Sequence, residues 1–96
     1  MEKVYVTAEI TVKTGWINEA EVILRELAKF ALNECGCESY QIMQSLETQG
    51  KYSTLEVWMS KENERKHWDS KGLSEYVNKL KPMLEFPPVV KKYIEL

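Results

Sequence analysis

Residues 39–59, SYQIMQSLETQGKYSTLEVWM, decide the fold of this 96-residue chain. The stretch holds two strand-like runs, about Ser39 to Leu46 and Tyr52 to Met59, with the turn ETQGK between them. Two runs joined by so short a glycine-containing turn predict a β-hairpin. A hairpin alone cannot bury its apolar side chains, so the flanking sequence must supply the elements that cover it.

The sequence before the hairpin predicts one strand and one helix. From residue 4 to residue 12 apolar side chains alternate with polar ones or tyrosine, a period of two that indicates a strand with one apolar face. A helix follows, and we expect Asn18 to cap it with Glu21 reaching back as in a capping box. Its apolar positions lie at helical spacing up to Ala31, and Gly36 marks its end.

The sequence after the hairpin predicts further helix and a last strand. Ser60 is a typical N-cap, and two glutamates in the next four residues suit the positive end of a helix. Gly72 is expected to interrupt this helix, and a second apolar stripe runs from Leu73 towards Pro82, where the missing backbone donor ends it. Residues 86–96, FPPVVKKYIEL, read as a strand whose prolines stand at its start.

The order β-α-β-β-α-β over residues 1–96 predicts a single α+β domain of ferredoxin-like type. We expect an antiparallel sheet with helices on one face only. The third strand nevertheless carries apolar or aromatic side chains on both faces, with Tyr52 and Trp58 on one face and Leu55, Val57 and Met59 on the other. A second apolar face needs cover, so we expect a homodimer in which two sheets face each other.

Composition argues against several classes of partner. Net charge is −2 and no basic patch stands out, so we expect neither nucleic acid nor membrane as a partner. The N-terminus lacks the pattern of a signal peptide, and no apolar run reaches membrane-span length, so the expected location is cytoplasmic. Cys35 and Cys37 fit no zinc spacing and are expected to be two small residues of a turn.

Residues 55–70 gather the side chains best suited to chemistry. Glu56 and Trp58 share one face of the third strand, and His67, the single histidine, follows nine residues after Trp58. If that face meets the helices, Glu56 and His67 can pair, which would offset the cost of burying Glu56 and make His67 a better base. The residues alone leave a second interpretation open, in which His67 is a solvated helix residue and Trp58 is plain core.

Three segments in this order resemble the antibiotic biosynthesis monooxygenase family, which consists of small dimeric α+β barrels. A Gly-Cys turn followed by a strand tyrosine matches Gly36, Cys37 and Tyr40. A Glu-x-Trp at the end of the hairpin and a helical His-x-x-Ser follow, and these match Glu56, Trp58, His67 and Ser70. The chain departs from the family where members often carry a second histidine, because Gly72 stands there. The positions of the haem-binding residues of related proteins correspond to Ala8 and about Val77, so haem ligation is not implied.

The resemblance implies oxygenation of a quinol-like or polyphenolic aromatic by dioxygen, without metal, flavin or any other cofactor. A deprotonated hydroquinone donates electrons readily, so the protein needs only a base, a dry pocket and orientation. His67 is then the expected base, Glu56 its orienting partner and Trp58 the wall on which the ring stacks. Tyr40 and Tyr52 are expected to bind the substrate. The alternative is a non-catalytic dimeric module that binds small molecules or partners on the same fold.

Overall fold

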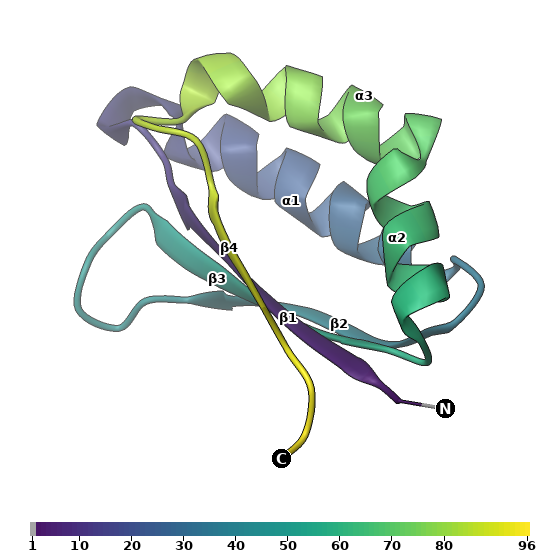
Figure 1. Cartoon of the computed structure of the whole chain (residues 1–96). Helices are drawn as coiled ribbons and strands as arrows, with labels where there is room; N and C mark the ends of the chain where they lie inside the picture. Colours follow the sequence, from purple (N-terminus) through teal and green to yellow (C-terminus); the bar gives the residue numbers. More distant parts are fainter. Residues whose placement is uncertain (1) are drawn as a thin grey trace.

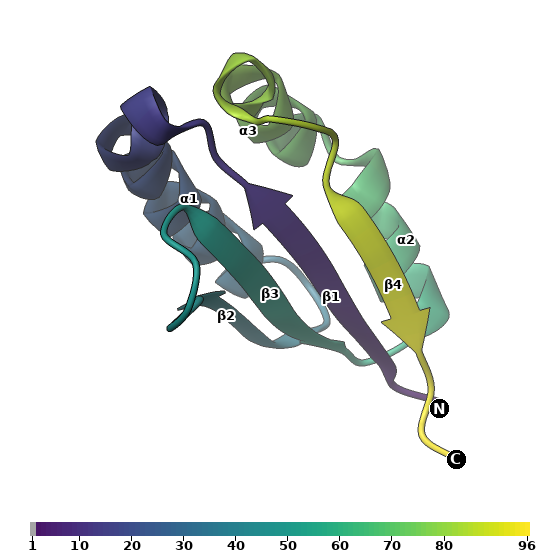
Figure 2. The same ribbon diagram turned by 90° about the vertical axis from the view of Figure 1, so that its left-hand side faces the viewer.

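The computed structural model describes residues 2–96 and contains four strands and three α-helices. The elements are β1 (Val4–Thr11), α1 (Ile17–Leu32), β2 (Cys37–Gln44), β3 (Lys51–Trp58), α2 (Lys61–Asp69), α3 (Lys71–Leu80) and β4 (Val89–Tyr93). Short 3₁₀ turns at Thr14–Trp16 and Lys81–Met83 precede α1 and follow α3. The sheet order is β2-β3-β1-β4, and all three strand pairings are antiparallel (Figure 2).

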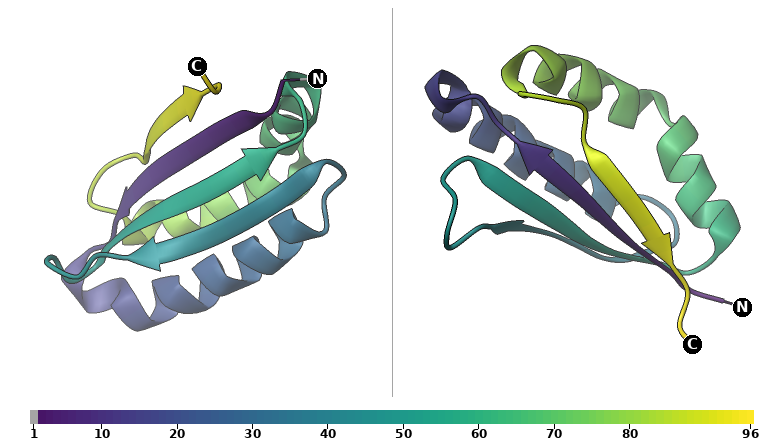
Figure 3. Two further views of the ribbon diagram at one scale, coloured as in Figure 1. Left: turned by 90° about the horizontal axis from the view of Figure 1, so that it is seen from below. Right: turned by 60° about the vertical axis from the view of Figure 1, so that its left-hand side comes forward.

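The three α-helices lie on one face of the sheet, and the opposite face is left uncovered (Figures 1 and 3). This arrangement confirms the expected α+β fold of ferredoxin-like type, in which β3 and β1 are the central strands and β2 and β4 are the edge strands. The burial pattern along β3 shows the alternation directly, because Tyr52, Thr54, Glu56 and Trp58 are buried while the residues between them are not. The uncovered face carries Leu55 and Met59, both more than a third exposed.

Two details of the helices differ from the sequence-based expectation. Helix α1 begins one residue before Asn18, after the 3₁₀ turn, and its N-cap is Trp16 without a side-chain hydrogen bond. The predicted capping box is therefore wrong, and Glu21 bonds to the Tyr52 hydroxyl instead. The break between α2 and α3 falls at Ser70 rather than Gly72, because the Ser70 hydroxyl accepts from the Leu73 N–H and starts a new helix.

The space between helices and sheet contains two groups of buried apolar residues. The first lies under α2 and the second half of α1, and it consists of Val4, Val6, Leu27, Ala31, Tyr40, Trp58 and Leu73. The second lies under the first half of α1 and the end of α3, and it consists of Ile10, Val12, Ala20, Leu24, Tyr52, Leu80 and Leu84. We call these groups the α2 end and the α1 end of the core.

Candidate functional site

A transverse row of four residues crosses the sheet beneath α2. Strand pairing places Tyr40 of β2 beside Glu56 of β3, Glu56 beside Val6 of β1, and Val6 beside Lys92 of β4. Side chains opposite one another in antiparallel strands lie on the same face. The row therefore presents a phenol, a carboxylate and an ammonium to the layer between the sheet and α2.

Glu56 is 4% exposed, and two donors from its own strand hold its carboxylate. Thr54 Oγ1 donates to Oε2 at 2.7 Å, and Trp58 Nε1 donates to Oε1 at 3.0 Å. The Thr54 hydroxyl also accepts from the Ala8 N–H at 2.8 Å, where the pairing of β1 with β3 is interrupted. The alternation of β3 places these three side chains on one face, so the strand itself supplies most of the compensation for the buried charge.

Burial raises the pKa of Glu56 above its ordinary value. The two hydrogen bonds and the nearby His67 act in the opposite direction, and the Glu64 carboxylate adds to the rise. Desolvation is the largest of these effects because the site excludes water. Burying the ionised Glu56 carboxylate therefore costs free energy of folding, and such groups are common at functional sites.

His67 lies in the same layer, on the inner face of α2, and is 2% exposed. Its Nδ1 is hydrogen-bonded to the carboxylate of Glu34, which comes from the turn between α1 and β2. An ionised carboxylate can only accept, so Nδ1 carries the proton of the neutral ring and Nε2 keeps the lone pair. The arrangement is that of a base whose tautomer and orientation are fixed by an acid.

The turn that carries Glu34 is held against the first turn of α2. Gly36 has φ +81°, and a Cβ atom built there would lie 2.2 Å from Cγ of Asn63. The Met59 N–H donates to the Gly36 carbonyl at 2.8 Å. Glycine is required here both by the backbone and by the close contact, and this fit brings Glu34 within reach of His67.

Aromatic rings surround the imidazole. The Trp58 ring lies 4.5 Å from the His67 ring between centroids, at an angle of 32°, and the Tyr40 ring lies at 6.0 Å. Trp58 is 0% exposed, so its faces are already covered by protein atoms. The structure therefore leaves no ring-sized space between His67 and Trp58, although the two side chains lie together as expected.

The expected hydrogen bond between Glu56 and His67 is wrong. The partner of His67 is Glu34, and Glu56 instead bonds to Thr54 and Trp58. Both carboxylates lie on the helix side of the sheet, so Glu56 still acts on the site through its charge. Sequence reasoning missed Glu34 because a turn residue has no periodic pattern that shows where its side chain points.

A second acidic residue of α2 reaches the row on the sheet. Glu64 is 5% exposed, and its Oε2 lies 2.9 Å from Nζ of Lys92. The distance is that of an ion pair, but the angles are not those of a hydrogen bond, and Oε2 has no hydrogen-bond donor among the described residues. The Lys92 ammonium also lies 5.3 Å from the centre of the Trp68 ring. These contacts and the His67–Glu34 bond hold α2 against the rest of the molecule.

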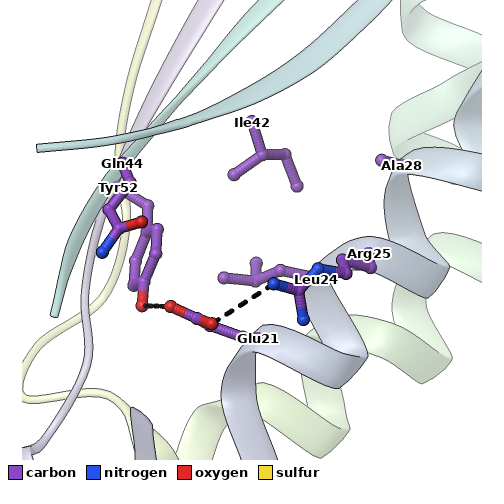
Figure 4. Close-up of a pocket in the computed structure, with 7 residues that line it drawn as sticks. All are labelled: Glu21, Leu24, Arg25, Ala28, Ile42, Gln44 and Tyr52. Atoms are coloured by element: carbon purple, nitrogen blue, oxygen red, sulfur yellow. Dashed lines mark hydrogen bonds and ion pairs between the residues drawn. The ribbon is translucent and has the colours of Figure 1, made fainter. Parts of the chain in front are cut away.

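Tyr52, the other expected substrate-binding residue, lies away from this cluster. It stands four positions before Glu56 along β3, which corresponds to about 13 Å. It lines a cleft of about 190 Å³ between α1 and the hairpin (Figure 4). Its hydroxyl donates to Glu21 at 2.5 Å, and Arg25 lies 3.4 Å from the same carboxylate. Burial, with help from Glu21, raises the pKa of Tyr52 to about 12.

The two cysteines form no disulfide, and Cys37 is unsuited to act as a thiolate at neutral pH. Burial raises the pKa of the Cys37 thiol to about 11, so that thiol stays protonated, and Cys35 is exposed and free.

The described residues hold no cluster of three histidine, cysteine, aspartate or glutamate side chains suited to a metal ion. Within residues 2–96, none of the helices combines the length and the apolar character of a membrane span. A Cβ atom at Gly72 would lie 2.3 Å from the Phe30 ring, so that ring occupies the place of a larger side chain.

Known proteins that are similar to this chain agree with the fold. A family model described as antibiotic biosynthesis monooxygenase matches residues 3–79. A conserved protein from Methanosarcina mazei is 25% identical with a TM-score of 0.94, and the match covers 100% of this chain and 95% of that chain. A candidate antibiotic biosynthesis monooxygenase from Caulobacter crescentus is also 25% identical, with a TM-score of 0.91 and coverage of 99% and 91%.

A more distant structure, from Bacteroides thetaiotaomicron, is described as a conserved protein of unknown function and a possible oxidoreductase. It is 19% identical with a TM-score of 0.89, and the match covers 98% of both chains. No curated protein matches this chain.

Proposed function

The chain belongs to the antibiotic biosynthesis monooxygenase family, and from this premise we propose that it is a cofactor-independent monooxygenase of quinol-like or polyphenolic aromatics. The observation that carries the proposal is the buried His67 imidazole, held by the Glu34 carboxylate and packed against Trp58. An oriented imidazole in a dry, aromatic-lined layer is suited to remove a phenolic proton.

The proposed reaction is balanced without a reductant. His67 Nε2 accepts a proton from the quinol, and the resulting anion is oxidised by dioxygen. One oxygen atom enters the ring and the other leaves as water, so a hydroquinone and dioxygen give a hydroxyquinone and water. The roles follow: His67 is the base, Glu34 rather than Glu56 orients it, and Glu56 fixes Trp58, the wall of the site. Tyr40, whose ring lies 6.0 Å from the His67 ring between centroids, is the tyrosine proposed to contact the substrate.

Access to His67 requires α2 to move. The imidazole has almost no exposed surface, so a ring reaches Nε2 only when α2 separates from the sheet. A nine-residue helix is too short to be stable by itself, and serine side chains at both ends define it as a unit. Its ties to the sheet and to the α1–β2 turn include the bond from Asn63 to the Cys35 carbonyl and the polar contacts of Glu64 and His67, and a substrate can replace the contacts of Glu64 and His67.

The test is oxygen uptake with a panel of quinols, followed by detection of labelled oxygen in the product. We expect His67→Ala to lower turnover by about 10²–10⁴-fold, the usual contribution of a positioned base. Glu34→Gln should lower it less, because the amide can still hold the ring. Cys35→Ser is the control and should leave turnover unchanged. Full activity of His67→Ala would exclude His67 as the base.

A second candidate function is a non-catalytic module that binds small molecules or partners. The filled layer around Trp58 favours it, because an enzyme needs space for its substrate beside the reacting group. Failure of the wild-type protein to consume oxygen with every quinol, together with saturable binding of one of them, would establish this alternative.

We also propose a homodimer built through the uncovered face of the sheet. Val57, Tyr5 and Tyr93 stand side by side across β3, β1 and β4 on that face. Further exposed apolar side chains surround them, namely Met43, Leu55, Met59 and Val89. Exposed apolar side chains gathered on one face of a sheet are typical of an interface. Sedimentation that shows a monomer at micromolar concentration would contradict the dimer.

A further inference from the structure

A cleft of about 680 Å³ lies between the first half of α2 and the end of β4. The two elements run near one another at the edge of the molecule (Figures 2 and 3). The lining residues that matter here are Val4, Lys61, Glu64, Arg65, Lys92 and Ile94. The cleft adjoins the site described above, because Val4 pairs with Trp58 in the sheet and Lys92 belongs to the row that includes Glu56.

The inner wall of the cleft has an acceptor without a donor. Glu64 is more than nine-tenths buried, and its Oε2 is a buried oxygen with no hydrogen-bond partner among the described residues. The Lys92 ammonium lies 2.9 Å from this oxygen as an ion pair without hydrogen-bond geometry, and a ligand hydroxyl that donates to the carboxylate would add the missing hydrogen bond. The Lys92 ammonium beside the same oxygen would stabilise the ligand oxygen if its proton were lost.

The mouth of the cleft carries two basic side chains, and Glu62, which pairs with Lys66, also lines the cleft. Lys61 and Arg65 both line it, and they stand at positions i and i+4 of α2, where like charges repel each other on one helix face. Lys61 has a long contact of 3.7 Å with Glu2, and the structure gives the Arg65 guanidinium no ion-pair partner within residues 2–96. An anionic group bound between these two side chains would relieve their repulsion, and a carboxylate matches the planar guanidinium.

We propose that this cleft binds a phenol that carries a carboxylate, with the hydroxyl at Glu64 and Lys92 and the carboxylate at Lys61 and Arg65. Val4 and Ile94 then contact the aromatic ring. This inference rests on the proposed function for the class of aromatic, and it narrows that class to phenolic acids. It makes Arg65 a specificity-determining residue and Glu64 a substrate-binding residue.

The test compares two ligands that differ by one carboxylate, 2,5-dihydroxybenzoate and hydroquinone, by calorimetry without oxygen. We expect the acid to bind wild-type protein at least tenfold more tightly. Arg65→Met should weaken binding of the acid about tenfold and leave hydroquinone unchanged. Lys66→Met is the matched control, because it removes a positive charge from the same helix outside the cleft, and it should change neither affinity. Glu64→Gln should weaken both ligands.

Benzoate tests the hydroxyl, and wild-type protein should bind it more weakly than 2,5-dihydroxybenzoate. The proposal is overturned if Arg65→Met and Lys66→Met have equal effects, if benzoate binds as well as the hydroxylated acid, or if neither phenol binds. Arg65 is exposed, so its replacement keeps the test readable even if Glu64→Gln does not fold. Turnover is not part of this measurement, so a protein that binds the acid without oxidising any quinol would refute the monooxygenase and leave the cleft assignment standing.

Discussion

The two ends of the core contain different types of side chain although the same sheet lies beneath both. The α1 end consists of aliphatic side chains and one tyrosine whose hydroxyl bonds to Glu21 at the edge of the layer. The α2 end encloses Glu56, Glu64 and His67 beside its apolar residues, all at 5% exposure or less. One end removes hydrocarbon from water, and the other also removes charge.

The α1 end shows the apolar burial that stabilises a small domain, and the α2 end shows the buried charged groups that a functional site requires. Burying aliphatic groups stabilises a fold by about 25 cal/mol for each Å² of apolar surface removed from water. Burying a carboxylate opposes folding unless donors are arranged around it, as Thr54 and Trp58 are around Glu56. A 96-residue chain has little stability to spare, so an end that carries such a cost points to function.

The largest effect should come from Trp58, because this ring joins the apolar and the charged parts of the α2 end. Trp58→Ala removes a fully buried indole and also the donor to Glu56, so the free energy of unfolding should fall by about 3–5 kcal/mol. Urea denaturation at fixed protein concentration measures it. Trp68→Ala, which removes a partly exposed indole, is the control, and equal effects of the two substitutions would remove the distinction between the two rings.

Glu56→Gln should change how stability depends on pH, with a smaller effect than loss of the Trp58 ring. The folded-state pKa of Glu56 is raised, so its protonated form is the one that favours the fold. The contribution of protonated Glu56 to the free energy of unfolding is fully present below the unfolded-state pKa of about 4.3. It is lost as pH rises through the raised pKa of the folded state. Urea denaturation from pH 4 to pH 7 should show this loss in the wild type and not in the variant. Parallel curves would show that Glu56 is not a source of strain.

The smallest effect should distinguish the two buried tyrosines. The Tyr52 hydroxyl donates to the Glu21 carboxylate, whereas the structure shows no hydrogen bond of the Tyr40 hydroxyl within residues 2–96. Tyr52→Phe should therefore lower the free energy of unfolding by about 1.5–3 kcal/mol at most, the range for a bond to a charged group. Tyr40→Phe should change it by less than about 0.5 kcal/mol. Thermal unfolding of both variants measures the two losses of stability. A larger loss for Tyr40→Phe than for Tyr52→Phe would contradict the hydrogen bonds described here.

Most of the fold could be read from the sequence because alternation and turn residues are local signals. The strand at Val4–Thr11 and the Ser60 cap follow from such signals. The start of α1 differs from the sequence-based prediction because a 3₁₀ turn places Trp16, rather than Asn18, at the boundary. Gly72 looked like the break between the last helices, but the Ser70 hydroxyl starts α3 and glycine is tolerated in its first turn.

The site could be predicted only in part. Period-two alternation predicts that Glu56 and Trp58 share one face of β3, and in the structure that face lies toward the helices, where Trp58 contacts His67. The identity of the acid that bonds His67 depends on how the turn before β2 packs against α2, through contacts between residues about 30 positions apart. Burial of Glu64 beside Lys92 is of the same kind, because charged residues on a helix and on an edge strand usually remain in water.

The contact between Gly72 and Phe30 has a consequence for the ancestry of the chain. A side chain at position 72 would meet the Phe30 ring of α1, because even a Cβ atom there would lie 2.3 Å from it. Introducing histidine at position 72 first would clash with Phe30, and replacing Phe30 with a small residue first would leave a void. A small residue at both positions is the intermediate that avoids the clash. Homologues should accordingly show paired changes at these two alignment columns, with histidine in one accompanied by a small side chain in the other. Such covariation would show that the two positions share one packing volume.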